Sequence, residues 1–225
     1  MTSRGASRTI ALALTALAGT VILGASQAHG VGEPGFSCKK VHRGTAATNP
    51  NPKGKPPLVI GDSTVNLPIP NLSQAGFDVN ARGCRGILEA IDVAAKLRRK
   101  GRLPHLILMN GYANGGIKDK QVDELLDAIG RARVVVLLTE YDADTGRGAA
   151  ADTRELFVAR RQNPHQIAVL DWVHHSRPHH FADPAPGAWF LKDLFHPNFA
   201  GADAYAQFLA GALPLAKEGS FPPLH

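Results

Sequence analysis

The stretch "LVIGDSTV", Leu58 to Val65, places a small hydroxyl residue where an apolar run ends. Gly, Asp and Ser are common turn residues, so an ordinary turn after a strand is one interpretation. Ser63 could instead be a nucleophile held at the carboxyl end of a sheet. A serine hydroxyl is a weak nucleophile unless a base takes its proton and a third group orients that base. A catalytic role for Ser63 therefore requires a base and an orienting group elsewhere in the sequence.

The segment "DLFHPNFAG" offers a base and its orienting partner. Asp193 and His196 are three residues apart, so both side chains can point the same way from one turn before Pro197 starts a helix. A Gly-Asp-Ser tripeptide and an Asp-x-x-His spacing are each common by chance. Their combined placement, after the first predicted strand and before the last predicted helix, favours a triad of Ser63, His196 and Asp193.

Alternating segments of two kinds must position these residues. From residue 57 onward, short continuous apolar runs alternate with stretches whose apolar residues recur at helical spacing. This alternation indicates a parallel sheet covered on both faces. We predict a doubly wound α/β domain, a three-layer α/β/α sandwich with a parallel sheet of about five strands. The expected strands are 58–62, 78–82, 105–110, 133–140 and 166–172, and the expected helices are 86–101, 118–132, 151–162 and 198–213.

Loops at the carboxyl ends of parallel strands form the ligand crevice of such a sheet. Ser63 follows the first predicted strand, residues 82–86 follow the second, and residues 110–116 follow the third. Asp193 and His196 lie in the last loop before the final predicted helix. We therefore expect these distant segments to meet at one end of the sheet.

These blocks resemble the SGNH/GDSL hydrolase superfamily over roughly residues 57–213. "GDS" is similar to the family's first block, which supplies the nucleophile, here Ser63. "DLFHP" is similar to the last block, which supplies Asp193 and His196. "AVLDW" and "AWFLKDLFHPNFAGADAYA" further resemble a bacterial exported branch that is related to sugar O-acyltransferase domains.

The resemblance also implies an oxyanion hole, made by the backbone N–H groups of Ser63 and Arg85 and the side-chain amide of Asn114. "NARGCRG" is similar to the second block, where Gly86 is the alternative to Arg85. "NGYANGG" is similar to the third block, which normally reads Gly-x-Asn. A tyrosine stands at the Gly position here, and Asn110 is the alternative to Asn114.

The resemblance implies acyl transfer through an acyl-enzyme, without a cofactor. The first expectation is a secreted serine esterase that hydrolyses short acyl esters, either small esters or acylated glycans. An O-acyltransferase acting on envelope glycans and a catalytically silent binding module of the same fold are the alternatives. The histidine-rich "HHSRPHH" has no distinctive ligand spacing, so we predict no metal site. Oligomeric state is left open.

The N-terminal residues predict export. Residues 1–28 contain Arg4, Arg8, no acidic residue, an apolar run, and small residues at Ser26 and Ala28, which is the layout of a cleaved secretory signal peptide. A retained membrane anchor is the alternative, although the run is short for a full span.

Signal removal lowers the formal net charge from +6 to about +4, and no dense basic block follows, so nucleic-acid binding is not expected. We expect an extracellular protein without stable membrane insertion after cleavage.

The next segment, 29–56, is rich in Gly, Pro, Asn and Thr and is expected to form an extended or flexible arm. An SGNH-like hydrolase domain is expected at 57–225.

The chain has two cysteines, Cys38 and Cys84. In an exported protein they favour one disulfide, with two unrelated buried thiols as the alternative. A bridge would hold the arm beside the predicted crevice.

Overall fold

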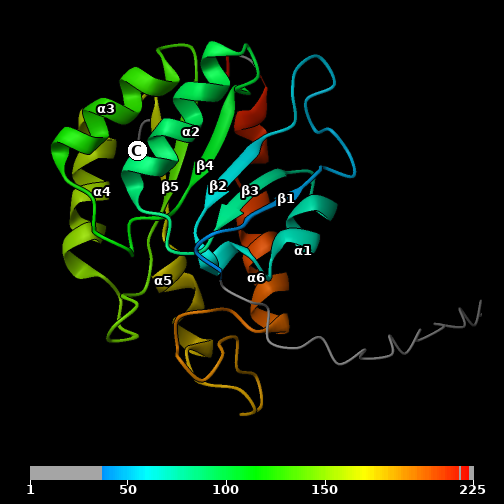
Figure 1. The fold of residues 1–225 in the computed structure, drawn as a ribbon, viewed down its shortest axis with the longest axis vertical. Coiled ribbons are helices and arrows are strands. Elements are labelled where there is room, and N and C mark those ends of the chain that lie inside the picture. Colours follow the sequence, from blue (N-terminus) through cyan, green and yellow to red (C-terminus); the bar gives the residue numbers. More distant parts are fainter. Residues whose placement is uncertain (1–36, 218, 223–225) are drawn as a thin grey trace, which may run out of the picture. The chain divides into compact units, whose positions relative to one another are not determined.

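The computed structural model describes residues 37–217 and 219–222. The predicted signal peptide, residues 1–28, lies outside the described residues. Within the described part, no helix is both long and apolar enough to span a bilayer. The described residues form an α/β/α sandwich around a six-stranded sheet (Figure 1).

The five predicted strands are all present and pair in parallel. Every residue of the three central strands is buried, which explains their continuous apolar sequences. The predicted α/β fold with its parallel sheet is thus confirmed. The strands are β2 (Leu58–Gly61), β3 (Asp78–Arg82), β4 (Leu106–Met109), β5 (Val134–Leu138) and β6 (Ile167–Leu170).

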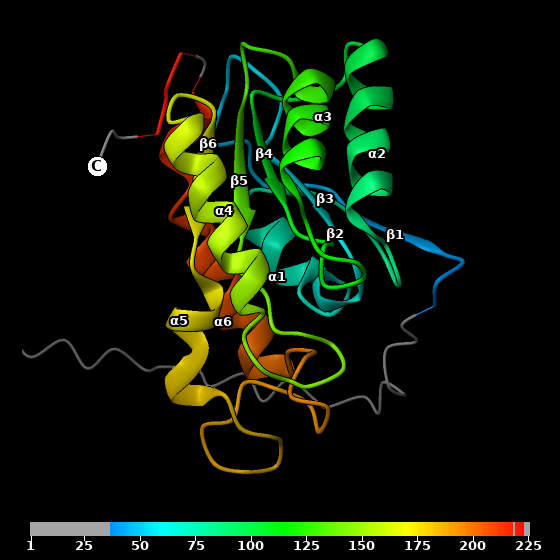
Figure 2. The ribbon, with the colours of Figure 1, turned by 90° about the vertical axis from the view of Figure 1, so that its left-hand side faces the viewer.

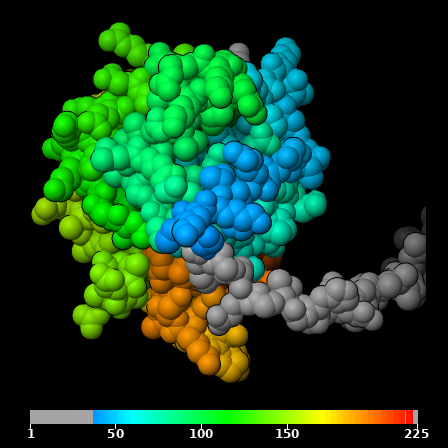
Figure 3. All heavy atoms as spheres, in the orientation of Figure 1, coloured from blue at the N-terminus to red at the C-terminus, as the bar shows by residue number. Residues whose placement is uncertain are grey.

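A further strand, β1 (Val41–Gly44), comes from the segment predicted as an arm. It pairs antiparallel with β3, with Val41 opposite Arg82 and Gly44 opposite Val79. The sheet is therefore mixed at one edge, which the sequence analysis did not anticipate. On the face shown in Figure 3, β1 (blue) lies at the surface. The sequence VHRG has no apolar alternation, so pairing with β3, not local pattern, decides its conformation.

Helices cover both faces of the sheet. On one face, Val59, Leu108 and Val136 pack in a core with residues of α1 (Ile69–Gln74) and α6 (Phe199–Ala210). On the other, Ile60, Ile107 and Leu137 pack with α2 (Ile87–Arg99), α3 (Asp119–Ile129) and α4 (Ala150–Gln162). Figure 2 shows α2 and α3 side by side along the sheet. The shorter helices are α5 (Trp172–Ser176), η1 (Ser63–Val65), η2 (Arg177–His179) and η3 (Leu213–Ala216).

The strand order β1-β3-β2-β4-β5-β6 places a topological switch point beside β2. The chain leaves β2 toward β3 on one side and later enters β4 on the other side. Ligands of open α/β sheets bind outside the carboxyl ends of the strands at such a point. The segment that follows β2, which begins with Asp62 and Ser63, therefore lies where the fold leaves a crevice.

Cys38 and Cys84 form a disulfide, which confirms the sequence prediction. Their Cα atoms are 5.1 Å apart, within the range that a bridge requires. Because β1 pairs antiparallel with β3, residues just before β1 lie near residues just after β3. The bridge thus ties the start of β1 to the loop between β3 and α2.

Candidate active site

Ser63 lies one residue beyond the end of β2, separated from it by Asp62, at the start of η1. The Oδ1 atom of Asp62 caps this turn, accepting the backbone N–H of Thr64 at 2.9 Å and its hydroxyl at 2.7 Å. Asp62 is fully buried, and Ser63 keeps 8% of its surface exposed. The Gly-Asp-Ser sequence thus forms a buried, internally hydrogen-bonded turn that presents one hydroxyl at the end of the sheet.

The structure brings the three residues of the predicted triad together. The Nε2 atom of His196 lies 2.9 Å from Ser63 Oγ, and its Nδ1 atom lies 2.6 Å from Asp193 Oδ2. With the proton on Nδ1, the imidazole donates to the carboxylate and its Nε2 accepts the serine hydroxyl proton. Ser63 and His196 are 133 residues apart in the chain, so only the fold creates this contact.

The loop that carries Asp193 and His196 is held in one conformation. Asp193 Oδ1 accepts the backbone N–H groups of Phe195 and His196, both at 3.0 Å. Burial opposes ionisation of Asp193, but the hydrogen bond from the His196 side chain and these backbone bonds outweigh it and lower the pKa to about 2. Leu194 has a left-handed φ of 57°, and His180 Nε2 donates to its carbonyl oxygen at 2.8 Å. Asp193 is therefore an ionised, oriented partner for the imidazole at neutral pH.

Helix α6 anchors the same loop from its other end. The helix begins after Asn198, which caps it by accepting the N–H of Gly201 at 2.9 Å. The start predicted from sequence, at residues 197–198, thus lies within two residues of the observed one. Asn198 also donates to the carbonyl oxygen of Ala188 at 2.8 Å, and Gly201 packs so close to the Trp189 carbonyl that a Cβ would not fit. These contacts fix the segment between residues 188 and 198.

The second block supplies backbone N–H groups near the nucleophile. The N–H of Arg85 donates to the carbonyl oxygen of Arg82 at 3.3 Å. Within the part of the chain that the structure describes, the N–H groups of Gly86 and Ser63 have no backbone acceptor. Cys84 has a left-handed φ of 56°, which turns the chain between Arg82 and Arg85, and it is held by its disulfide. The arrangement favours Gly86, the alternative considered from sequence, over Arg85 as an available donor.

The side chain of Arg85 has a role that the sequence analysis missed. It is fully buried, and its guanidinium donates to the carbonyl oxygen of Gly61 at 3.0 Å, to that of Asn80 at 2.5 Å and to Asn80 Oδ1 at 2.9 Å. Its Nε lies 3.4 Å from Glu89. Burial lowers the pKa of this guanidinium, and the negative charge of Glu89 opposes that effect. Arg85 thus links the end of β2 to β3 and to the first turn of α2.

The third block contacts the nucleophile turn through both candidate asparagines. Asn114 Nδ2 donates to Asp62 Oδ2 at 3.1 Å. Asn110 is buried; its Oδ1 accepts the N–H of Asp62 at 3.3 Å, and its Nδ2 donates to the hydroxyls of Thr64 at 2.8 Å and Tyr205 at 3.3 Å. The amide of Asn110 is therefore committed to bracing the turn. Asn114 is exposed and is the asparagine able to turn toward a bound substrate.

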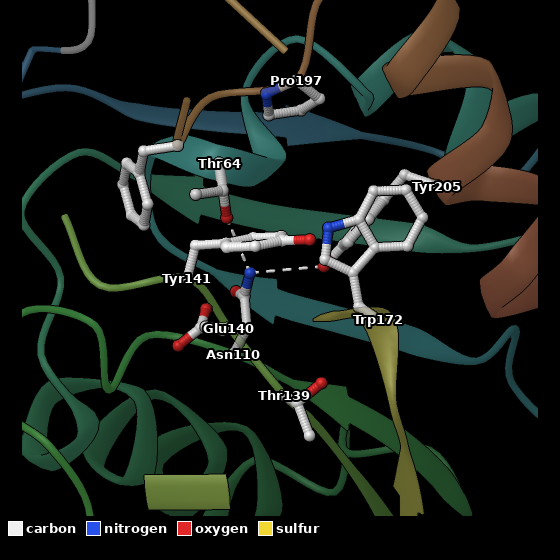
Figure 4. A pocket seen from close by; sticks show the side chains of 9 residues that line it. Thr64, Asn110, Thr139, Glu140, Tyr141, Trp172, Pro197 and Tyr205 are labelled. Atoms are coloured by element: carbon white, nitrogen blue, oxygen red, sulfur yellow. Dashed lines mark hydrogen bonds between the residues drawn. The ribbon is translucent and has the colours of Figure 1, made fainter. Parts of the chain in front are cut away.

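Glu140 is a second functional candidate that the sequence analysis missed. It lies just beyond β5, is 5% exposed, and lines the small cavity shown in Figure 4 with Thr64, Asn110 and Tyr205. Its carboxyl oxygens accept the N–H groups of Gly111 at 3.3 Å and Ala113 at 3.0 Å, which holds the third-block loop. Burial raises the pKa of Glu140 well above its usual range, and the negative charge of Asp62 adds to the effect. An acid ending the apolar run "RVVVLLTE" was the available sequence signal.

Two other sequence features have structural explanations. Tyr112, at the position where the resemblance expects a Gly, is fully buried and packs in one core cluster with residues of α2 and α3. Within residues 37–217 and 219–222, no group of three His, Cys, Asp or Glu side chains could hold a metal ion. Three histidines of "HHSRPHH" stack on aromatic rings instead, in the pairs His175–Phe208, His179–Trp189 and His180–Tyr141.

Two solved structures are similar to this chain. One is the C-terminal catalytic domain of the Streptococcus pneumoniae peptidoglycan O-acetyltransferase A, solved with a methylsulfonyl adduct. It is 21% identical, with a TM-score of 0.57, over 72% of this chain and 93% of that domain. The other is a Bacteroides fragilis protein assigned as an acylhydrolase, which is 17% identical, with a TM-score of 0.51, over 74% of this chain and 90% of that protein.

At these identities the likeness concerns the fold. No family model matches the sequence, and no curated protein matches it either. The likeness to both structures shows that this chain has the fold of SGNH/GDSL hydrolases, as the sequence blocks had indicated.

Proposed function

We propose that this chain is an exported serine esterase that hydrolyses short acyl esters on carbohydrate. The observation that carries this proposal is the hydrogen-bonded series from Ser63 Oγ through the His196 imidazole to Asp193, with distances of 2.9 and 2.6 Å. A serine, a base within reach of its proton and a carboxylate that orients the base are the components of nucleophilic acyl transfer. The SGNH-type fold supports the same reaction class.

In the first half of the reaction, Ser63 Oγ attacks the carbonyl carbon of the ester while His196 Nε2 takes the hydroxyl proton. Asp193 stabilises the imidazolium that forms, since its low pKa keeps it ionised. The tetrahedral intermediate then breaks its bond to the sugar oxygen, which leaves with the proton from His196. The acyl group remains on Ser63.

The oxyanion of the intermediate needs nearby donors. We assign the backbone N–H groups of Ser63 and Gly86, with Arg85 as the neighbouring alternative, and the side-chain amide of Asn114. In the free protein this amide donates to Asp62, so it must turn toward the substrate oxygen on binding. Each such donor is typically worth about 3 kcal/mol of transition-state stabilisation.

In the second half, water attacks the acyl-enzyme while His196 again accepts a proton, and a carboxylic acid is released. A sugar hydroxyl in place of water would make the protein an O-acyltransferase. This second candidate is favoured by one observation, the likeness to a peptidoglycan O-acetyltransferase catalytic domain. The disulfide between Cys38 and Cys84 supports export, because disulfides persist in oxidising compartments.

The test is a comparison of the full chain with variants on 4-nitrophenyl acetate and butyrate, with and without a glycan acceptor. Ser63→Ala and His196→Ala should each abolish nearly all turnover, and the double variant should be little worse, because these residues act as a unit. His165→Ala, an exposed histidine before β6, is the matched control and should keep wild-type rates. A fluorophosphonate probe should label Ser63.

The acceptor experiment separates the candidates. Acetate release that the glycan does not change supports the esterase, whereas acetyl groups appearing on the glycan support the transferase. A wild-type chain that takes no probe and turns over no short ester would instead favour a silent binding module.

A further inference from the structure

An open groove beside the candidate active site carries three arginines. It is lined by Tyr141, Arg147, Arg154, Arg177 and His180, with Asp171 at its side. These residues come from the loop after β5, the first turns of α4, and the segment from the end of β6 through η2. We call this depression the arginine groove.

The arginine groove adjoins the loop that carries Asp193 and His196. Gly146, one of its lining residues, packs so closely that an added Cβ would lie 3.1 Å from Leu194 Cβ and 3.5 Å from the Asp193 carbonyl oxygen. His180 donates to the Leu194 carbonyl oxygen at 2.8 Å. Tyr141 lines both the groove and the cavity beside the nucleophile turn. A substrate at Ser63 could therefore extend into the groove.

The charge of the groove is positive and largely uncompensated. All three arginines are exposed. Arg154 lies 3.6 Å from Glu155, whereas Arg147 and Arg177 have no side-chain hydrogen bond or ion pair with any other residue that the structure describes. Asp171 is the one acid among the described residues that line the groove.

One oxygen of the Asp171 carboxylate, Oδ1, is occupied by other partners. It accepts the hydroxyl of Thr139 at 2.8 Å and the backbone N–H of His174 at 3.0 Å. Both bonds end on Oδ1, so three guanidinium groups line the groove with one carboxylate that they do not pair with in the described residues.

The backbone that presents Arg147 is ordered by local bonds. The loop from Tyr141 to Gly148 is closed by a β-bridge between these two residues. Within it, Asp142 accepts the backbone N–H of Thr145 at 2.8 Å and its hydroxyl at 2.9 Å. These bonds lower the pKa of Asp142, with the Thr145 hydroxyl as the largest contribution, so it stays ionised and keeps its partners. The groove wall is thus built before any ligand arrives.

We propose that the arginine groove binds an anionic oxygen group, a carboxylate or a phosphate, carried by the glycan next to its acylated sugar. Guanidinium groups match the planar or tetrahedral arrangement of such oxygens and can bind them through two hydrogen bonds at once. This inference rests on the proposed function and narrows its substrate class from acylated carbohydrate to acylated acidic carbohydrate.

The first experiment measures binding, so it does not depend on catalysis. The full chain is titrated by calorimetry at low salt with three oligosaccharides of equal length: an oligogalacturonide, a phosphorylated mannan fragment and a neutral xylo-oligosaccharide. We expect at least tenfold tighter binding of one or both anionic ligands, with affinity falling as salt increases. The two anionic arms identify whether carboxylate or phosphate is preferred.

Variants locate the binding site. Arg147→Gln and Arg177→Gln should each weaken anionic binding by about threefold to fivefold, the effect expected for a partly exposed ion pair. Arg102→Gln is the matched control, because Arg102 lines another basic groove at the opposite end of the sheet, beside the start of β2. It should bind as the wild type does. Equal affinity for neutral and anionic ligands, or wild-type affinity in the Arg147→Gln/Arg177→Gln double variant, overturns the proposal.

The second experiment measures acetate release from O-acetylated forms of the same three glycans. The ratio of kcat/KM for anionic over neutral substrates should exceed ten in the wild type and fall in the double variant. Hydrolysis of all three at equal rates overturns the arginine groove and leaves the esterase standing. Anionic binding without hydrolysis of any ester supports the groove and contradicts the esterase.

Discussion

Replacement of Arg85 by Met is expected to be one of the most destabilising single changes in this chain. Its guanidinium donates to the carbonyl oxygens of Gly61 and Asn80 and to the Asn80 side chain, and the Arg85 side chain is fully buried. Met retains an unbranched apolar chain but no donor, so the substitution removes hydrogen bonds while keeping most of the volume. Glu89 keeps its ion pair with Arg82.

The magnitude follows from the three acceptors that lose their donor. A buried acceptor left unsatisfied costs about 1–3 kcal/mol, and burying Met in place of a charged group returns part of that cost. Removing one partner from a buried charged network typically costs about 3–5 kcal/mol. We expect a loss of about 3–5 kcal/mol in the free energy of unfolding, which is a large share of the roughly 5–15 kcal/mol of an ordinary domain.

Urea unfolding followed by tryptophan fluorescence measures this loss, because Trp172 and Trp189 both lie near the candidate site. Arg99→Met is the control, since Arg99 is exposed near the end of the same helix, α2. It should change the free energy of unfolding by less than about 0.5 kcal/mol. Arg85→Lys should fall between the two, because an ammonium keeps the charge but cannot reach all three acceptors.

Activity of the folded Arg85→Met fraction should also fall, mainly in kcat. The Gly61 carbonyl lies just before Asp62 and Ser63. Without the hydrogen bond from Arg85 to this carbonyl oxygen, the turn that presents the nucleophile is held less firmly. A stability loss below about 1 kcal/mol with unchanged kcat would refute the reasoning, since it would mean that the guanidinium neither satisfies these acceptors nor holds the turn.

Three further predictions concern other parts of the molecule. Replacing Cys38 and Cys84 by Ser should lower the free energy of unfolding by up to about 4 kcal/mol on chain-entropy grounds for a separation of 46 residues; free thiols in the oxidised wild type would contradict the bridge. The pKa of Glu140 is raised in the folded state. The contribution of this carboxyl to the free energy of unfolding is therefore present below its ordinary pKa of 4.5 and is lost as pH rises toward the folded pKa. The stability of Glu140→Gln relative to wild type should therefore improve between pH 4 and pH 8 in urea unfolding, and parallel pH profiles would refute this. Asn114→Ala should lower kcat by about 10²–10³-fold with little change in stability, and a wild-type kcat would remove Asn114 from the oxyanion hole.

The five parallel strands and the longer helices could be predicted because periodicity in the sequence reports burial directly. The run "VVVLL" of β5 is apolar throughout because both faces of that strand are covered, and this pattern needs no knowledge of its neighbours. The three-residue spacing of Asp193 and His196 is equally local, and it places the two side chains within 2.6 Å of each other. The pairing of the only two cysteines required no choice among partners.

The tertiary structure alone decided which partners the polar groups near Ser63 find. The edge strand β1 has no apolar signature, and its conformation comes from pairing with β3. The buried guanidinium of Arg85, the loop-holding carboxyl of Glu140 and the committed amide of Asn110 all depend on where loops from different strands end. The left-handed turn at Cys84 decides that the N–H of Arg85 donates to Arg82, whereas the N–H of Gly86 has no backbone acceptor among the described residues. Hydrogen bonds are short-range and directional, so shifts of about an ångström between distant segments determine them, and no spacing along the chain encodes such shifts.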